Sequence, residues 1–137
     1  MTRGVRPALL GLVLAQAAHS IEEYSTRLYD VLPPVRYVSG LLSDDRRIGF
    51  VIFNVALVAF GFWCALSSFR RQDRRPPATS LAWFWVVLET GNGLVHIGWA
   101  AVAGGYRPGL ATAPLLLAFA FILGRELRRV SAPASVR

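Results

Sequence analysis

Four long apolar runs, separated by short polar segments, make up most of this 137-residue sequence and constrain its fold more than any other feature. Hydrophobic residues account for 54% of the chain, more than a soluble domain usually carries. A run of about 20 apolar residues can cross the hydrocarbon core of a bilayer as a helix. The sequence therefore predicts an all-α fold in a single domain over residues 1–137: a polytopic membrane four-helix bundle with spans at about 7–28, 47–69, 79–103 and 108–127.

The basic residues lie beside the apolar runs and favour a membrane over nucleic acid as the partner. The formal net charge is +7, and all 15 basic residues are arginines. Arginines cluster in segments 70–75 and 125–129, at the ends of predicted spans, where anionic headgroups attract them. Four spans place both termini on the side of these clusters, which the positive-inside rule makes cytoplasmic. We expect a multi-pass protein of the cell membrane with lipid neighbours and no nucleic-acid partner, and an oligomer of the same chain is left open.

The first predicted span has an alternative interpretation. A basic start, a short apolar stretch and Ala15-Gln16-Ala17 are also typical of a secretory signal peptide with its cleavage site. The apolar stretch continues past that site into polar residues at helical spacing, which favours a helix that stays in the protein.

Segment 25–46 mixes charged, proline and apolar residues and is predicted as a loop on the membrane surface or as a cap on the bundle. Its end, Ser43-Asp44-Asp45, is typical of a helix N-cap with acidic residues placed for the helix dipole.

Polar residues at helical spacing interrupt two of the apolar runs. In the first run Glu22 and Glu23 follow His19 by three and four residues, so all three share one helix face. In the third run a second stripe consists of Glu89, Asn92 and His96. The two stripes contain both histidines of the protein.

Counting at 1.5 Å per helical residue places these stripes, with Asn54 and Thr112, in the outer half of the predicted bundle. An ionised carboxylate at the bilayer centre costs about 2.5–3.5 kcal/mol, so Glu89 is expected to face the interior with a partner. We therefore expect both imidazoles and Glu89 to meet near the extracytoplasmic face.

Two imidazoles and three carboxylates on facing helices are suited to one divalent metal ion, zinc or iron. The candidate ligands are His19, Glu22, Glu23, Glu89 and His96. Without a metal, a carboxyl and an imidazole could act as general acid and base, with catalytic candidates Glu89, His96, His19 and Glu23. Either chemistry inside a membrane predicts an enzyme acting on a lipid or isoprenoid-like hydrophobic substrate. The alternatives are a non-enzymatic metal- or ligand-binding, sensing or transport protein and, below these, an intramembrane hydrolase or protease.

Candidates for substrate binding are Asn54, Asn92 and Thr112. The simpler interpretation of the two asparagines is hydrogen bonding between helices. For Thr112 it is a hydroxyl bonded back within its own helix, beside Pro114.

The segment His19-Ser-Ile-Glu22-Glu23 resembles the motif of the HXXEE-domain membrane proteins, a bacterial group of small multi-span proteins. Nearly the whole chain is similar to that pattern, including Glu89, Asn92, His96 and the turn Tyr106-Arg-Pro-Gly109. The resemblance implies a membrane protein suspected of enzymatic or metal-binding activity and assigns no role to any residue.

A shorter stretch, Glu22-Glu23-Tyr-Ser-Thr-Arg27, resembles the EExxxR motif of the CAAX-type intramembrane proteases. The chain departs from that family where His96 follows Asn92, since the family's FxxxH motif has a phenylalanine there.

Overall fold

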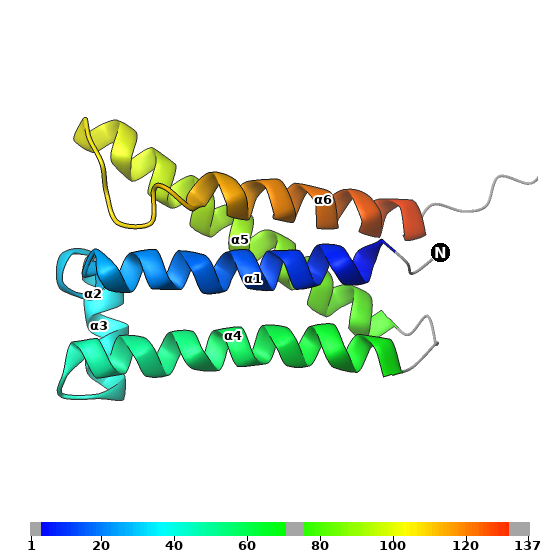
Figure 1. Cartoon of the computed structure of the whole chain (residues 1–137), viewed down its shortest axis with the longest axis horizontal. Helices are drawn as coiled ribbons and strands as arrows, with labels where there is room; N and C mark the ends of the chain where they lie inside the picture. The colour runs from blue at the N-terminus through cyan, green and yellow to red at the C-terminus, as the bar shows by residue number, and fades with distance from the viewer. Residues whose placement is uncertain (1–3, 71–75, 132–137) are drawn as a thin grey trace, which may run out of the picture.

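The computed structural model describes residues 4–70 and 76–131, and every regular element within them is a helix. Four long helices form a bundle, and two short helices close one of its ends (Figure 1). One of the long helices, α5, runs obliquely to the other three. In chain order they are α1 (Val5–Ser25), α2 (Leu28–Val31), α3 (Pro33–Leu42), α4 (Arg46–Arg70), α5 (Pro76–Ala103) and α6 (Ala113–Ser131). The all-α prediction is confirmed for the described residues.

Helix α1 lies between α4 and α6 and contributes the centre of the apolar core (Figure 1). Its Leu12 and Val13 are fully buried, together with Trp85 of α5. The glycine at position 61 of α4 allows this contact, since a Cβ there would lie 2.8 Å from Val13 Cγ2 and 3.0 Å from Trp85 Cζ2. This core fills the half of the bundle nearer the N-terminus and leaves the polar stripes to the other half.

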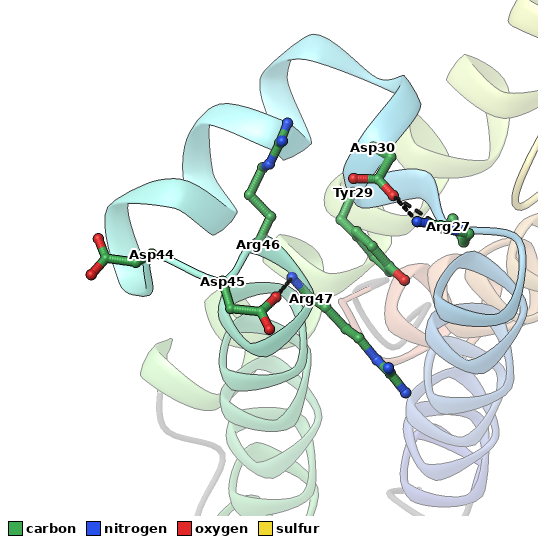
Figure 2. A pocket seen from close by; sticks show the side chains of 7 residues that line it. All are labelled: Arg27, Tyr29, Asp30, Asp44, Asp45, Arg46 and Arg47. Carbon is green, nitrogen blue, oxygen red and sulfur yellow. Dashed lines mark hydrogen bonds and ion pairs between the residues drawn. The ribbon is translucent and has the colours of Figure 1, made fainter.

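Segment 25–46 is not a loop but the pair of short helices that caps the bundle. Arg27, with a φ of 58°, turns the chain sharply between α1 and α2. Helix α3 packs against α4 so closely that a Cβ on Gly49 would lie 1.9 Å from the carbonyl oxygen of Ser39. The predicted N-cap is confirmed, because Asp45 Oδ1 accepts a hydrogen bond of 2.9 Å from the backbone N–H of Arg47 (Figure 2).

The start of the last helix differs from the prediction. Helix α6 begins at Ala113, five residues after the predicted start at Pro108. Two glycines in the left-handed region, Gly104 (φ 67°) and Gly109 (φ 86°), keep segment 104–112 out of the helix. Thr112 therefore precedes the helix, and its predicted back-bonding inside it is wrong. Helix α1 also ends earlier than predicted, at Ser25.

One helical segment among the described residues, Arg46–Ser67 of α4, is both long and apolar enough to cross a membrane. The polar stripes lower the hydropathy of α1 and α5, and α6 is free of charge only over 113–124. Four membrane spans are therefore not established by length and apolarity.

Replacing Gly49 with alanine should separate α3 from α4, because the new methyl group would collide with backbone at Ser39. We expect the free energy of unfolding to fall by about 1–3 kcal/mol, measured by thermal unfolding. Gly40→Ala in α3 is the matched control, since a Cβ there meets nothing within 4 Å. Equal stability of the two variants would contradict the close packing of α3.

Candidate functional site

Three polar side chains of α1 and α5, His19, Glu23 and His96, converge in the bundle; we call them the triad. Glu23 Oε1 lies 3.3 Å from His19 Nε2 and 3.1 Å from His96 Nε2. The two imidazole rings meet edge to face with their centroids 4.8 Å apart. One candidate ligand atom from each residue lies within 4.8 Å of the others, which is within reach of a single metal ion. The expected meeting of the two imidazoles is confirmed.

The triad is buried: relative exposure is 0% for His19, 2% for His96 and 6% for Glu23. Spacing of four residues puts His19 and Glu23 on one face of α1. Helix α5 crosses the bundle obliquely (Figure 1), and its His96 lies against both residues. Although His19 Nε2 is close to Glu23, its geometry does not make a hydrogen bond, so this buried nitrogen has no hydrogen-bond partner among the described residues. A buried polar atom without a partner is costly, and a bound ion would remove that cost.

The opposite nitrogen of each ring is held by segment 104–112. His96 Nδ1 lies 2.6 Å from the carbonyl oxygen of Pro108, which can only accept, so Nδ1 carries the proton. His19 Nδ1 lies 2.7 Å from Thr112 Oγ1, whose own hydrogen goes to Glu22, so this Nδ1 donates as well. Each neutral ring then presents the lone pair of Nε2 to Glu23. Outer partners that fix the ring in this way are characteristic of metal-binding histidines.

Glu22 holds segment 104–112 over the triad. Its Oε1 accepts from the Tyr106 hydroxyl (2.6 Å) and from the Ala111 N–H (3.0 Å). Its Oε2 accepts from the N–H (2.8 Å) and the hydroxyl (2.6 Å) of Thr112. The carboxylate raises the pKa of Tyr106 to about 12, because its negative charge opposes ionisation of the phenol that donates to it. Both oxygens of this candidate metal ligand are thus engaged by the loop, outside the triad.

Gly109 closes the loop onto the two imidazoles. A Cβ at this position would lie 2.5 Å from His96 Nδ1 and 2.9 Å from His19 Cε1, and the φ of 86° also favours glycine. The sequence gives only a weak signal for this role, namely a glycine after Pro108 in a predicted turn. The loop therefore covers the triad with the backbone of Gly109, beside the Thr112 hydroxyl that contacts His19.

A second polar layer connects α1, α4 and α5. Asn92 Nδ2 lies 3.5 Å from both Gln16 Oε1 and Glu89 Oε2. Gln16 donates to Ser20 Oγ (3.1 Å), and Ser20 donates to Asn54 Oδ1 (2.7 Å). Both asparagines therefore bond between helices, as their simpler interpretation predicts.

Glu89 is fully buried, as expected, and its Oε1 has no hydrogen-bond partner among the described residues. It is not part of the three-residue cluster that could hold a metal ion, so the expected meeting of Glu89 with the two imidazoles is not found.

A charged cleft of about 520 Å³ lies at the end of the bundle that α2 and α3 close, and it is lined by α2, the turn before α4 and the start of α4 (Figure 2). Arg27 and Asp30 point toward one another there and form an ion pair of 3.0 Å. Arg47 reaches toward α1 and donates to the hydroxyl of Tyr24. No residue of the triad lines this cleft. The charged residues of the cleft make this end of the bundle its polar end.

Changing Glu22 to glutamine should loosen segment 104–112, because a hydrogen bond to a charged group is worth about 1.5–3 kcal/mol. We expect hydrogen exchange at the amides of Ala111 and Thr112 to rise at least tenfold, measured by mass spectrometry. Glu126→Gln, the same change at a distant carboxylate on α6, should leave this exchange unaltered. Unchanged exchange in Glu22→Gln would exclude Glu22 as the residue that holds the loop.

A family model described as proteins of unknown function with an HXXEE motif matches residues 10–123, a range that contains the triad and Glu22. No curated protein and no solved structure matches the chain. The residues of the motif have two different roles in this structure. Its histidine and last glutamate, His19 and Glu23, belong to the triad, while Glu22 holds the loop. The chain belongs to the HXXEE family.

Proposed function

We propose that the protein is a four-span membrane protein that binds one divalent transition metal at the triad and uses it on a lipid-like substrate. The observation that carries this proposal is the convergence of His19 Nε2 and His96 Nε2 on one oxygen of Glu23. Both Nδ1 atoms are at the same time turned to acceptors outside the triad.

The surface of the bundle supports membrane insertion. Each of the four long helices exposes large apolar side chains, for example Leu14 (58%), Val55 (62%), Val87 (69%) and Phe121 (71%). In water such an extended apolar surface would cause aggregation, whereas lipid accommodates it. The charge-free stretch 48–69 of α4 spans about 33 Å, close to the thickness of the hydrocarbon core.

The polar residues of α1 and α5 are compatible with spanning, because they face protein. Gln16, His19, Glu89 and His96 are each 2% exposed or less. They lower the hydropathy of their helices without presenting polar groups to lipid. In membrane proteins, ionisable residues face the bundle interior in this way and usually mark a functional site.

The ligand set indicates the kind of metal. Two histidines and one carboxylate occur in catalytic zinc sites and in non-haem iron sites, and in both they leave coordination positions open. A metal bound there would act as a Lewis acid and lower the pKa of a bound water. In this chain Pro108 and Thr112 orient the two rings, and Gly109 brings the loop close enough to exclude water. Glu89 lies about 10 Å before His96 along α5, so it is not placed to exchange a proton directly with a group at the triad.

The position of the triad favours a substrate that reaches it from the bilayer. The triad lies in the half of the bundle next to the charged cleft, beside helices whose outer faces are apolar. A lipid or isoprenoid-like molecule could approach between such helices by lateral diffusion. The second candidate is a non-enzymatic metal-binding or sensing protein, which the near-complete burial of the triad favours.

The metal content of detergent-purified protein tests the proposal. We expect about one zinc or iron ion per chain in the wild type by elemental analysis. Less than a tenth of that should remain in His19→Ala, His96→Ala and Glu23→Gln, because each change removes one of three ligands. Glu126→Gln should retain the metal, and helical circular dichroism checks that every variant folds. A wild type that binds no metal after incubation with either ion, or triad variants that retain it, would overturn the proposal.

The hydroxyl of Thr112 offers a finer test, since it accepts from His19 Nδ1 without belonging to the triad. Thr112→Val removes the acceptor at nearly constant volume, and we expect a 10- to 100-fold loss of metal affinity in a competition titration. Thr112→Ser keeps the hydroxyl and should bind as the wild type does. Equal affinity in all three proteins would exclude an orienting role for Thr112.

A comparison of membrane lipids separates the two candidate functions. Cells producing the wild type or Glu23→Gln at equal levels are extracted, and their lipids are compared by mass spectrometry. A lipid product found only with the wild type indicates an enzyme. Identical lipids, together with stoichiometric metal in the wild type, would leave the non-enzymatic metal-binding role.

A further inference from the structure

A groove of about 380 Å³ runs between α5 and α6 at the end of the bundle opposite the triad. Its lining is mostly apolar, with Trp83 and Val86 on α5 and Phe121 on α6. Its floor is formed by two small residues of α6, Ala120 and Gly124. A Cβ on Gly124 would make ordinary van der Waals contact with Val86, at 3.5 Å, and with Trp83, at 3.9 Å, so no collision requires a glycine there.

Two arginines of α6 complete the groove at its end near the C-terminus. Arg125 and Arg128 are three residues apart and therefore lie on one face of the helix. Arg125 Nε is 3.9 Å from Glu126 Oε1, but the same oxygen is 2.8 Å from Arg129 Nη1. Arg128 makes no hydrogen bond or ion pair with another described residue. Two guanidinium groups thus stand beside an apolar groove without a strong protein partner.

We propose that this groove binds one anionic phospholipid of the membrane, with an acyl chain between α5 and α6 and the phosphate at Arg125 and Arg128. The match is one of charge and polarity: guanidinium groups form paired hydrogen bonds with phosphate oxygens, and the apolar walls take the chain. The apolar part of the groove lies among the apolar outer faces of the helices, and the two arginines lie at one end of it. A phospholipid has the same arrangement, with an apolar acyl chain next to a charged phosphate. Basic pockets between helices on the cytoplasmic side bind such headgroups in membrane proteins. The proposal rests on the membrane insertion proposed above and is independent of the metal.

Lipid titrations of the detergent-purified full chain test this site. Phosphatidylglycerol and phosphatidylcholine with identical acyl chains are added, and bound lipid is counted by native mass spectrometry. We expect the wild type to bind phosphatidylglycerol more tightly. The double change Arg125→Gln/Arg128→Gln should weaken phosphatidylglycerol binding roughly 30-fold and leave phosphatidylcholine binding unchanged. Arg36→Gln/Arg46→Gln, which removes two exposed charges at the other end of the bundle, is the control and should bind as the wild type does.

A second variant tests the groove itself. Gly124→Leu fills the floor while keeping both arginines, and we expect it to weaken binding of phosphatidylglycerol. Unchanged binding in Gly124→Leu would show that surface charge alone attracts the lipid. An equal loss of binding in the Arg125/Arg128 and Arg36/Arg46 double variants would show the same, and either result overturns the proposal. Metal content measured in the same samples reports on the triad separately. Recovery of the wild type without detergent would refute membrane insertion instead.

Discussion

The carboxylate of Glu23, shared by two imidazoles, is the interaction on which the site depends. Its Oε1 is the common neighbour of both Nε2 atoms, so it joins the first long helix to α5. Few other residues of these two helices contact one another, so a metal ion held by the three side chains would also fix how the helices align. If a metal ion were bound between the three side chains, Glu23 Oε1 would be one of its ligands. One group thus serves both the alignment of the helices and the proposed chemistry.

Further polar groups form hydrogen-bonded layers on both sides of the triad. Thr112 and the carbonyl of Pro108 hold the outer nitrogens of the rings, and Glu22 holds Thr112. Below the triad, Asn92 connects Gln16 of α1 to Glu89 of α5. Each layer joins a helix to a segment that is distant in the sequence. The hydrogen bonds of the buried polar groups and the packing of the helices therefore specify the same arrangement.

The sequence predicts the triad better than it predicts the loop that covers it. Helical spacing alone places His19 and Glu23 on one face, and the scarcity of histidine selects His96 as their partner. The division of labour between Glu22 and Glu23 is not predictable in this way, since both are carboxylates at suitable spacing. It depends on segment 104–112, where a left-handed Gly109 delays the last helix to Ala113. For segment 25–46 the sequence predicts a surface loop or a cap but not its short helices, because these are stabilised by packing on α4 rather than by a long apolar pattern.

The hydrogen bonds of Glu22 join residues 90 positions apart in the chain, and this separation has a consequence for biosynthesis. The ribosome synthesises α1 long before the segment that covers its polar face. Until α5 and Thr112 have been translated, His19, Glu22 and Glu23 lack their partners from α5 and from segment 104–112. For a membrane protein, this nascent helix would have to wait at the interface or inside the translocon and enter the lipid together with its later partners.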